Sequence, residues 1–138
     1  YWREFEKNRV VPASNINDAI THTWCLTAKD LNATAILAAT NSGHTAQMIS
    51  RFRPACPVAA LTMHEKVRRQ LAICWGVIPF LTGEVNSTDR IFSLSVEVAL
   101  KERLVHNGDT VVITAGVPLG RSGSTNLIKA QVIDEAAM

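Results

Sequence analysis

The chain has 138 residues and a formal net charge of +2; apolar residues make up 47 % of it and charged residues 19 %. This length suits one domain with a sizeable core, and the composition argues against a disordered chain. The small charge, the lack of dense Lys/Arg runs and the lack of an apolar run of roughly 18–20 residues argue against a nucleic-acid partner and a membrane segment.

Residues 1–11 read as the end of a preceding unit. They include Tyr1, Trp2 and Phe5, whose apolar surface has too little neighbouring sequence to cover it, and the chain does not begin with Met. This charged segment also lacks the apolar centre of a signal peptide. We therefore expect residues 1–11 to be a linker or the end of a helix that belongs to another unit, and residues 12–138 to form the domain.

The first expected helix is capped by Ser14 or Asn15 and ends at Asn32. The apolar run 33–39 then predicts a strand, and the residues after it predict a second helix that ends near Arg53. At helical spacing, the inner face of the first helix would consist of Ile16, Ala19, Ile20, Thr23, Trp24, Thr27 and Leu31.

The next stretch predicts a short buried strand over residues 58–61, followed by a helix. Thr62 and Glu65 have the spacing of a capping box, in which each side chain bonds a free backbone N–H at the start of a helix. Because His64 lies inside this box, we expect it to be structural.

The second half of the chain completes an α/β pattern. Pro79 cannot donate to a sheet ladder, so the strand predicted over residues 77–81 should lie near an edge. A helix capped by Ser87 or Thr88 leads to a strand over residues 110–115, which is rich in β-branched residues. Strands separated by helices in this way are typical of a parallel sheet.

The last strand should run antiparallel. The connection 116–124 contains three glycines and a proline and cannot be the crossover that joins parallel neighbours. Beyond it, alternate residues are apolar, as in a half-exposed edge strand: Ile128, Ala130 and Val132. We therefore predict an α/β fold, a three-layer α/β/α sandwich around a five-stranded, mostly parallel mixed sheet whose last strand is antiparallel.

The turn 40–45 is the first candidate site. It joins a strand to a helix, where unpaired backbone N–H groups and the positive end of the helix dipole suit an anion such as phosphate. Its hydroxyls can donate hydrogen bonds, and its glycine lets the backbone approach a ligand closely. An ordinary turn whose hydroxyls only cap their own helix is the alternative. The residues are Thr40, Asn41, Ser42, Gly43, His44 and Thr45.

The second candidate is the glycine-rich loop after the strand 110–115. In a parallel sheet it leaves the same rim as the turn 40–45, and ligands of open α/β sheets bind outside that rim. Arg121 would supply the full positive charge that the turn lacks. A flexible surface connection is the alternative. The candidate residues are Gly120, Arg121, Ser122, Gly123 and Ser124.

The sequence shows no constellation for catalysis. The four histidines form no convincing metal-binding spacing, the carboxylates are scattered, and the three cysteines indicate neither a disulfide framework nor a zinc site. Reduced thiols fit a cytosolic protein. We therefore expect the chain to bind a ligand, without a metal, a cofactor or chemistry of its own.

Several motifs resemble the C-terminal domain of pyruvate kinases. The most specific are TNSGHTA at residues 40–46 and GDTVVITAGVP at residues 108–118, and the similarity extends in order over roughly residues 12–133. The resemblance implies an α/β/α domain that follows a TIM-barrel catalytic domain. That barrel makes pyruvate and ATP in glycolysis with magnesium and potassium, and its residues are absent here. Residues 1–11 then match the barrel's final helix or the linker after it.

The resemblance also implies a role for the domain. In the family it carries an allosteric effector site and one contact of the tetramer. The turn 40–45 would hold a phosphate of the effector, and the loop 116–124 would close over it. The implied partners are a phosphorylated small molecule, the catalytic barrel and further copies of the chain in a cytoplasmic homo-oligomer.

Two departures from the family pattern narrow the effector. Enzymes activated by fructose 1,6-bisphosphate often have Lys at the position of Asn41 and a Trp-Arg-Pro-Gly stretch at residues 117–120. A monophosphate such as AMP or a sugar phosphate is therefore favoured, with an empty site as the alternative. Two other classes stay open. One is a structural oligomerisation module, and the other is an α/β enzyme that uses Ser42 as nucleophile and His44 as acid/base but lacks a third partner.

Overall fold

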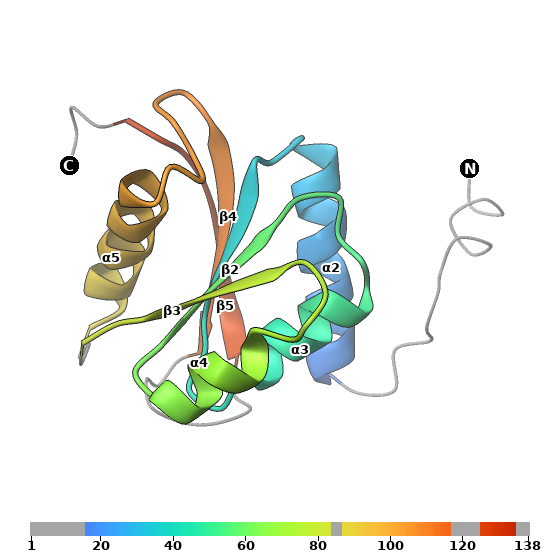
Figure 1. Ribbon diagram of the computed structural model, residues 1–138. Coiled ribbons are helices and arrows are strands. Elements are labelled where there is room, and N and C mark those ends of the chain that lie inside the picture. The colour runs from blue at the N-terminus through green and yellow to red at the C-terminus, as the bar shows by residue number, and fades with distance from the viewer. Residues whose placement is uncertain (1–15, 84–86, 117–124, 135–138) are drawn as a thin grey trace, which may run out of the picture.

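The computed structural model describes residues 16–83, 87–116 and 125–134. In it, helices and strands alternate up to the final pair of strands (Figure 1). The elements are α2 (Ile16–Asp30), β1 (Ala35–Ala39), α3 (His44–Arg51), β2 (Val58–Thr62), α4 (Glu65–Leu71), β3 (Val77–Leu81), α5 (Thr88–Lys101), β4 (Thr110–Gly116) and β5 (Thr125–Val132).

The strands form one five-stranded sheet in the order β3-β2-β1-β4-β5. Strands β3, β2, β1 and β4 are parallel to their neighbours, and β5 pairs with β4 antiparallel. The predicted α/β fold class and the antiparallel last strand are therefore confirmed. The strand that contains Pro79 lies at an edge of the sheet, as its missing N–H predicts.

Helices cover both faces of the sheet, which makes three layers. Helices α2, α3 and α4 lie against one face and α5 against the other (Figure 1). Alternate residues of β1 therefore enter different core clusters: Ile36 and Ala38 pack towards α2 and α3, and Ala35 and Leu37 pack towards α5. All four are fully buried. This explains why β1 reads as an unbroken apolar run rather than an alternating one.

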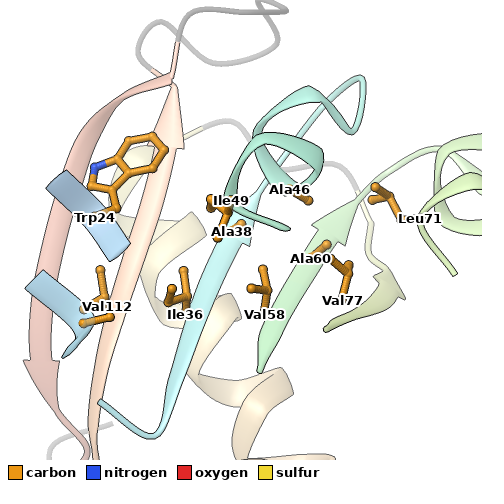
Figure 2. Packing of buried hydrophobic residues seen from close by; sticks show 11 residues of the cluster. Trp24, Ile36, Ala38, Ala46, Ile49, Val58, Ala60, Leu71, Val77 and Val112 are labelled. Atoms are coloured by element: carbon orange, nitrogen blue, oxygen red, sulfur yellow. The ribbon is translucent and has the colours of Figure 1, made fainter. Parts of the chain in front are cut away.

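The buried face of α2 differs from the expected one. Thr21, Trp24 and Ala28 are buried, whereas Thr23 is exposed and Leu31 is 45 % exposed. Figure 2 shows Trp24 among the side chains that α2, α3 and the strands contribute to this cluster. The small residues of α2 can be either buried or exposed. Their spacing in the sequence therefore did not show which of the helix faces that include Trp24 packs against the sheet.

The sheet has a topological switch point between β1 and β4. From β1 the chain adds β2 and then β3 on one side, and it then returns to place β4 on the other side of β1. The two strands run parallel with Ala38 opposite Thr114, so their carboxyl ends lie side by side. Ligands of open α/β sheets bind outside such a point, and the turn 40–45 begins there.

Candidate functional site

The turn 40–45 continues the ladder of β1 and then reverses into α3. The Thr40 N–H donates to the Leu61 carbonyl at 2.8 Å, and the Gly43 N–H donates to the Thr40 hydroxyl oxygen at 2.9 Å. Gly43 is the N-cap of α3 with φ 86° and ψ −5°, in the left-handed region that favours glycine. Thr40 is only 8 % exposed, and its hydroxyl oxygen closes the turn by accepting this hydrogen bond. For Thr40, this agrees with the alternative of an ordinary turn whose hydroxyls serve the start of their own helix.

The other two hydroxyls of the turn, those of Ser42 and Thr45, differ in exposure. Ser42 is exposed, and its hydroxyl oxygen lies 3.4 Å from the His44 backbone N, which donates to it. His44 is also exposed, whereas Thr45 is 5 % exposed and belongs to the buried side of the helix. Of the three, Ser42 and His44 are therefore the ones that solvent can reach.

The electrostatics of α3 differ from those of the two helices that follow it. Glu65 lies in the first turn of α4 and Asp89 in the first turn of α5, whereas the first turn of α3 has no acidic residue. A carboxylate near a helix N-terminus offsets the positive end of the helix dipole. Among these three helices, α3 is therefore the one whose own side chains offset the positive end of the helix dipole least.

His64 joins this turn, although the sequence did not indicate it. Its Nε2 lies 2.8 Å from the Asn41 Oδ1, across 23 positions of sequence. The predicted capping box at Thr62 is wrong. Thr62 is the last residue of β2, its hydroxyl accepts from the His64 N–H at 3.2 Å, and the Glu65 carboxylate binds Arg68 instead.

A buried hydroxyl lies one strand away from the turn. Thr114 on β4 is fully buried, and its Oγ1 has no hydrogen-bond partner among the described residues. Thr114 pairs with Ala38, and it shares the side of the sheet that holds Val112 and the α2 cluster. An unpaired buried hydroxyl is costly, so a polar atom that reached it at this end of the sheet would stabilise it.

The second candidate loop lies outside the described residues. Gly120, Arg121, Ser122, Gly123 and Ser124 therefore stay a prediction, as do the caps Ser14 and Asn15. The structure does describe the end of β4 at Gly116, beside the carboxyl end of β1. Both candidate segments thus start from neighbouring strands at the switch point.

Glu65 is the carboxylate nearest in sequence to His64, and it is paired within its own helix. The hydrogen bond from Arg68 to Glu65, together with the charges of Arg68 and Arg69, lowers the pKa of the Glu65 carboxyl. No group of three or more His, Cys, Asp or Glu residues in the described ranges is placed to hold a metal ion. Among the helices that are described, none is long and apolar enough to cross a membrane.

Comparison with known proteins identifies the family. Residues 18–131 match the family model described as pyruvate kinase, alpha/beta domain. The chain is 47 % identical over 120 residues to a pyruvate kinase of Clostridium acetobutylicum, which covers 87 % of the chain and 25 % of that protein. It is 45 % identical over 122 residues to a pyruvate kinase of Geobacillus stearothermophilus, covering 88 % of the chain and 21 % of that protein.

A third relative gives the same result over a longer stretch. The chain is 41 % identical over 133 residues to a pyruvate kinase of Staphylococcus aureus, covering 96 % of the chain and 23 % of that protein. The chain thus spans a quarter or less of the length of these relatives. Both the matched family model and the α/β fold agree with the motifs at residues 40–46 and 108–118. The chain therefore belongs to the family of pyruvate kinase C-terminal α/β domains.

Proposed function

We propose that the chain is the regulatory, effector-binding domain of a bacterial pyruvate kinase, and that the turn 40–45 binds a phosphate group of the effector. One observation carries this proposal. Helix α3 starts at the switch point of the sheet, and its first turn has no carboxylate to offset its dipole. The left-handed Gly43 sets the backbone of the turn at the start of this helix, in a conformation that favours glycine.

The class of effector follows from the charges that the described turn offers. The turn holds no Lys or Arg, and Asn41 stands where a second fixed charge would strengthen a bisphosphate clamp. A monophosphate such as AMP or a sugar phosphate fits this charge better than fructose 1,6-bisphosphate. The segment 120–124, with Arg121, would complete the site from the end of β4.

The remaining partners belong to the same proposal. The domain would pack with the catalytic barrel of its enzyme in the cytoplasm, and residues 1–11 would be the linker or helix that leaves that barrel. Phosphate transfer from phosphoenolpyruvate to ADP, with magnesium and potassium, would occur in the barrel. We therefore expect no pyruvate when this chain alone is mixed with phosphoenolpyruvate, ADP, magnesium and potassium; measurable turnover would contradict the assignment.

Titration calorimetry tests effector binding directly. AMP, ribose 5-phosphate, glucose 6-phosphate and fructose 1,6-bisphosphate are each titrated into the chain, into Ser42→Ala and into Ser93→Ala. Ser93 is a matched control because it is exposed and bonds only the Asp89 carbonyl on α5. Ser42→Ala should weaken a bound monophosphate by roughly 10- to 150-fold, the worth of a charged hydrogen bond, and Ser93→Ala should not.

A structural oligomerisation module is the second candidate, and the edge strand β5 favours it. Ile128 is 37 % exposed and Val132 is 59 % exposed on this edge, which leaves apolar surface for another copy. If no phosphate compound binds at millimolar concentration and sedimentation shows a dimer, this reading replaces effector binding. Dimerisation together with binding is compatible with both roles.

A further inference from the structure

We propose that His64 is a positioning residue of the effector site, which orients Asn41 and adds a positive charge that depends on pH. The effector's anionic group would then bind more tightly as the pH falls through the range in which histidine takes up a proton. This inference rests on the proposed effector site at the turn 40–45. It adds to that site His64, which belongs to the connection between β2 and α4, and a dependence of ligand binding on pH.

The parallel pairing of β1 and β2 brings the two residues together. Ala39 pairs with Leu61, and the Thr40 N–H extends the ladder by donating to the Leu61 carbonyl. The connections that leave these two strands therefore start side by side at the same end of the sheet. The contact between His64 Nε2 and Asn41 Oδ1, at 2.8 Å, closes the gap between them.

The conformation of His64 fits this role better than a purely local one. His64 is the N-cap of α4, yet its side chain makes no capping hydrogen bond. Its backbone N–H is already held by the Thr62 hydroxyl. The imidazole is thus exposed and reaches a neighbouring connection rather than serving its own helix.

The chemistry of the contact allows protonation without rearrangement. An amide oxygen only accepts, so with Asn41 in the assigned orientation the His64 Nε2 carries the hydrogen and donates it. Proton uptake at Nδ1 then adds a full charge and leaves this hydrogen bond in place. The same bond directs the Asn41 amide nitrogen away from His64.

Several charged or titratable residues follow His64 in the sequence or belong to the turn 40–45. On α4 they are Glu65, Lys66 and Arg68, and in the turn 40–45 the titratable residue is His44. Arg68 and Arg69 pair with Glu65, so the carboxylate beside His64 is already compensated. Glu84 and Arg121 lie outside the described residues. His44 is therefore the second histidine of the proposed site, and its contribution has to be separated from that of His64.

Thr114 is a further polar group on the strand next to β1. Its hydroxyl is fully buried on the neighbouring strand β4 and unpaired among the described residues, on the side of the sheet that faces α2.

Calorimetry at two pH values tests the proposal. Inorganic sulfate is the main probe because its charge is constant between pH 5.5 and pH 8.0, whereas a phosphate ester titrates near pH 6. In the H44Q background, sulfate should bind roughly three- to tenfold more tightly at pH 5.5 than at pH 8.0, as expected for one added charge several ångströms away. Ribose 5-phosphate is titrated under the same conditions as a second probe.

Three variants in this background separate charge from structure. His64→Gln can still donate to Asn41 but cannot be charged, so the ratio between the two pH values should fall close to one. His64→Lys should bind sulfate equally at both pH values, at about the affinity of the parent at pH 5.5. His106→Gln is the matched control, since His106 is an exposed histidine in the connection after α5, and it should leave the ratio unchanged.

The outcomes distinguish this inference from the proposed function. If sulfate and ribose 5-phosphate bind and His64→Gln keeps the full pH ratio, the role of His64 is wrong while the effector site stands. If neither probe binds at either pH, the effector site itself is wrong and the role of His64 falls with it. Thermal unfolding of each variant confirms that a change in binding is not a change in folding.

Discussion

The two ends of the sheet differ in how their polar groups are satisfied. At the carboxyl ends of the strands, α3, α4 and α5 begin, and the exposed side chains of Ser42, His44 and His64 there are hydroxyl and imidazole groups. At the amino ends the helices finish, and their last turns are closed by their own residues. Asn32, Arg53 and Arg103, which follow α2, α3 and α5, adopt positive φ angles of 54°, 49° and 61°.

Side chains complete the closure of the amino end. Arg53 lies 4.7 Å from the ring centroid of Trp75, and the Ser50 hydroxyl donates to the Trp75 carbonyl at 2.7 Å. Basic residues in the last turns of the helices, such as Lys29 and Lys101, complement the negative ends of the dipoles. The helix ends at the amino end are therefore stabilised by residues of the chain itself, whereas the turn 40–45 at the carboxyl end is the proposed ligand site.

Two glycines with positive φ offer the largest test of this contrast. A Cβ at Gly43 would lie 3.1 Å from Val67 Cγ1 and 3.3 Å from Leu71 Cδ2, whereas a Cβ at Gly76 would meet nothing within 4 Å. Gly43→Ala should therefore cost about 2–4 kcal/mol in the free energy of unfolding, from backbone strain plus crowding, and Gly76→Ala about 1–2 kcal/mol. Urea denaturation of both variants measures the difference.

The same two glycine variants also separate an effect on ligand binding from an effect on the free energy of unfolding. Gly43→Ala should weaken monophosphate binding because it alters the turn itself, and Gly76→Ala at the amino end should leave binding unchanged. Equal losses of stability would show that the α4 side chains yield easily to a new methyl group. Equal effects on binding would show that the two ends are not functionally distinct.

The pKa of the Cys25 thiol tests whether the amino end of the sheet excludes a charged side chain. Burial, with a smaller contribution from the charge of Cys56, raises the pKa of the Cys25 thiol to about 12. The unfolded thiol titrates near its usual ~8.5, so this contribution to stability is complete below that pH and is lost as the pH rises towards 12. Between pH 8 and pH 10 the loss should be about 1–2 kcal/mol.

Comparison with Cys25→Ala isolates this effect from other groups that titrate at alkaline pH. The variant should show a flatter dependence of the unfolding free energy on pH over the same interval. Parallel curves for the two proteins would mean that the thiolate of Cys25 reaches water in the folded state.

Much of the fold could be predicted because the local signals agree with the tertiary structure. The strands buried on both faces are continuous apolar runs, Pro79 marks an edge, and the short loop after β4 excludes a parallel crossover. The capping box failed because β2 continues through Thr62, which pairs with Leu81 on β3, so α4 cannot begin there. That pairing depends on a strand that comes later in the chain.

The candidate site was predictable only where it is local. The turn 40–45 is contiguous, and its glycine and hydroxyls can be read in one stretch. His64 reaches Asn41 only because β1 and β2 are neighbours, and a lone histidine before a helix carries no signal of that contact. The burial of Thr114, without a hydrogen-bond partner among the described residues, likewise depends on how the strands pack and cannot be read from the sequence.

Two serines extend the comparison between the two ends to smaller effects. Ser50 is 8 % exposed and bonds the Trp75 carbonyl, so Ser50→Ala should lower the free energy of unfolding by about 1 kcal/mol. Ser42 is exposed at the carboxyl end, and Ser42→Ala should change stability by less than about 0.5 kcal/mol while it weakens effector binding. A larger loss of stability for Ser42→Ala than for Ser50→Ala would reverse the assignment of the two ends.

The smallest expected effect measures the stack of Arg53 on Trp75. Arg103→Gly should raise the free energy of unfolding by about 0.5–1 kcal/mol, because glycine accepts positive φ and the relief of strain exceeds the added backbone entropy. Arg53→Gly gains the same relief but loses a cation–π contact worth roughly 0.5–1 kcal/mol, so its stability should hardly change. Trp75 is 51 % exposed, so salt should weaken the contact if it depends mainly on the charge of Arg53. If the contact depends mainly on packing against the ring, salt should weaken it little. Urea denaturation of both variants at low and high salt decides this, and equal stabilisation by the two substitutions would show that the stack contributes nothing.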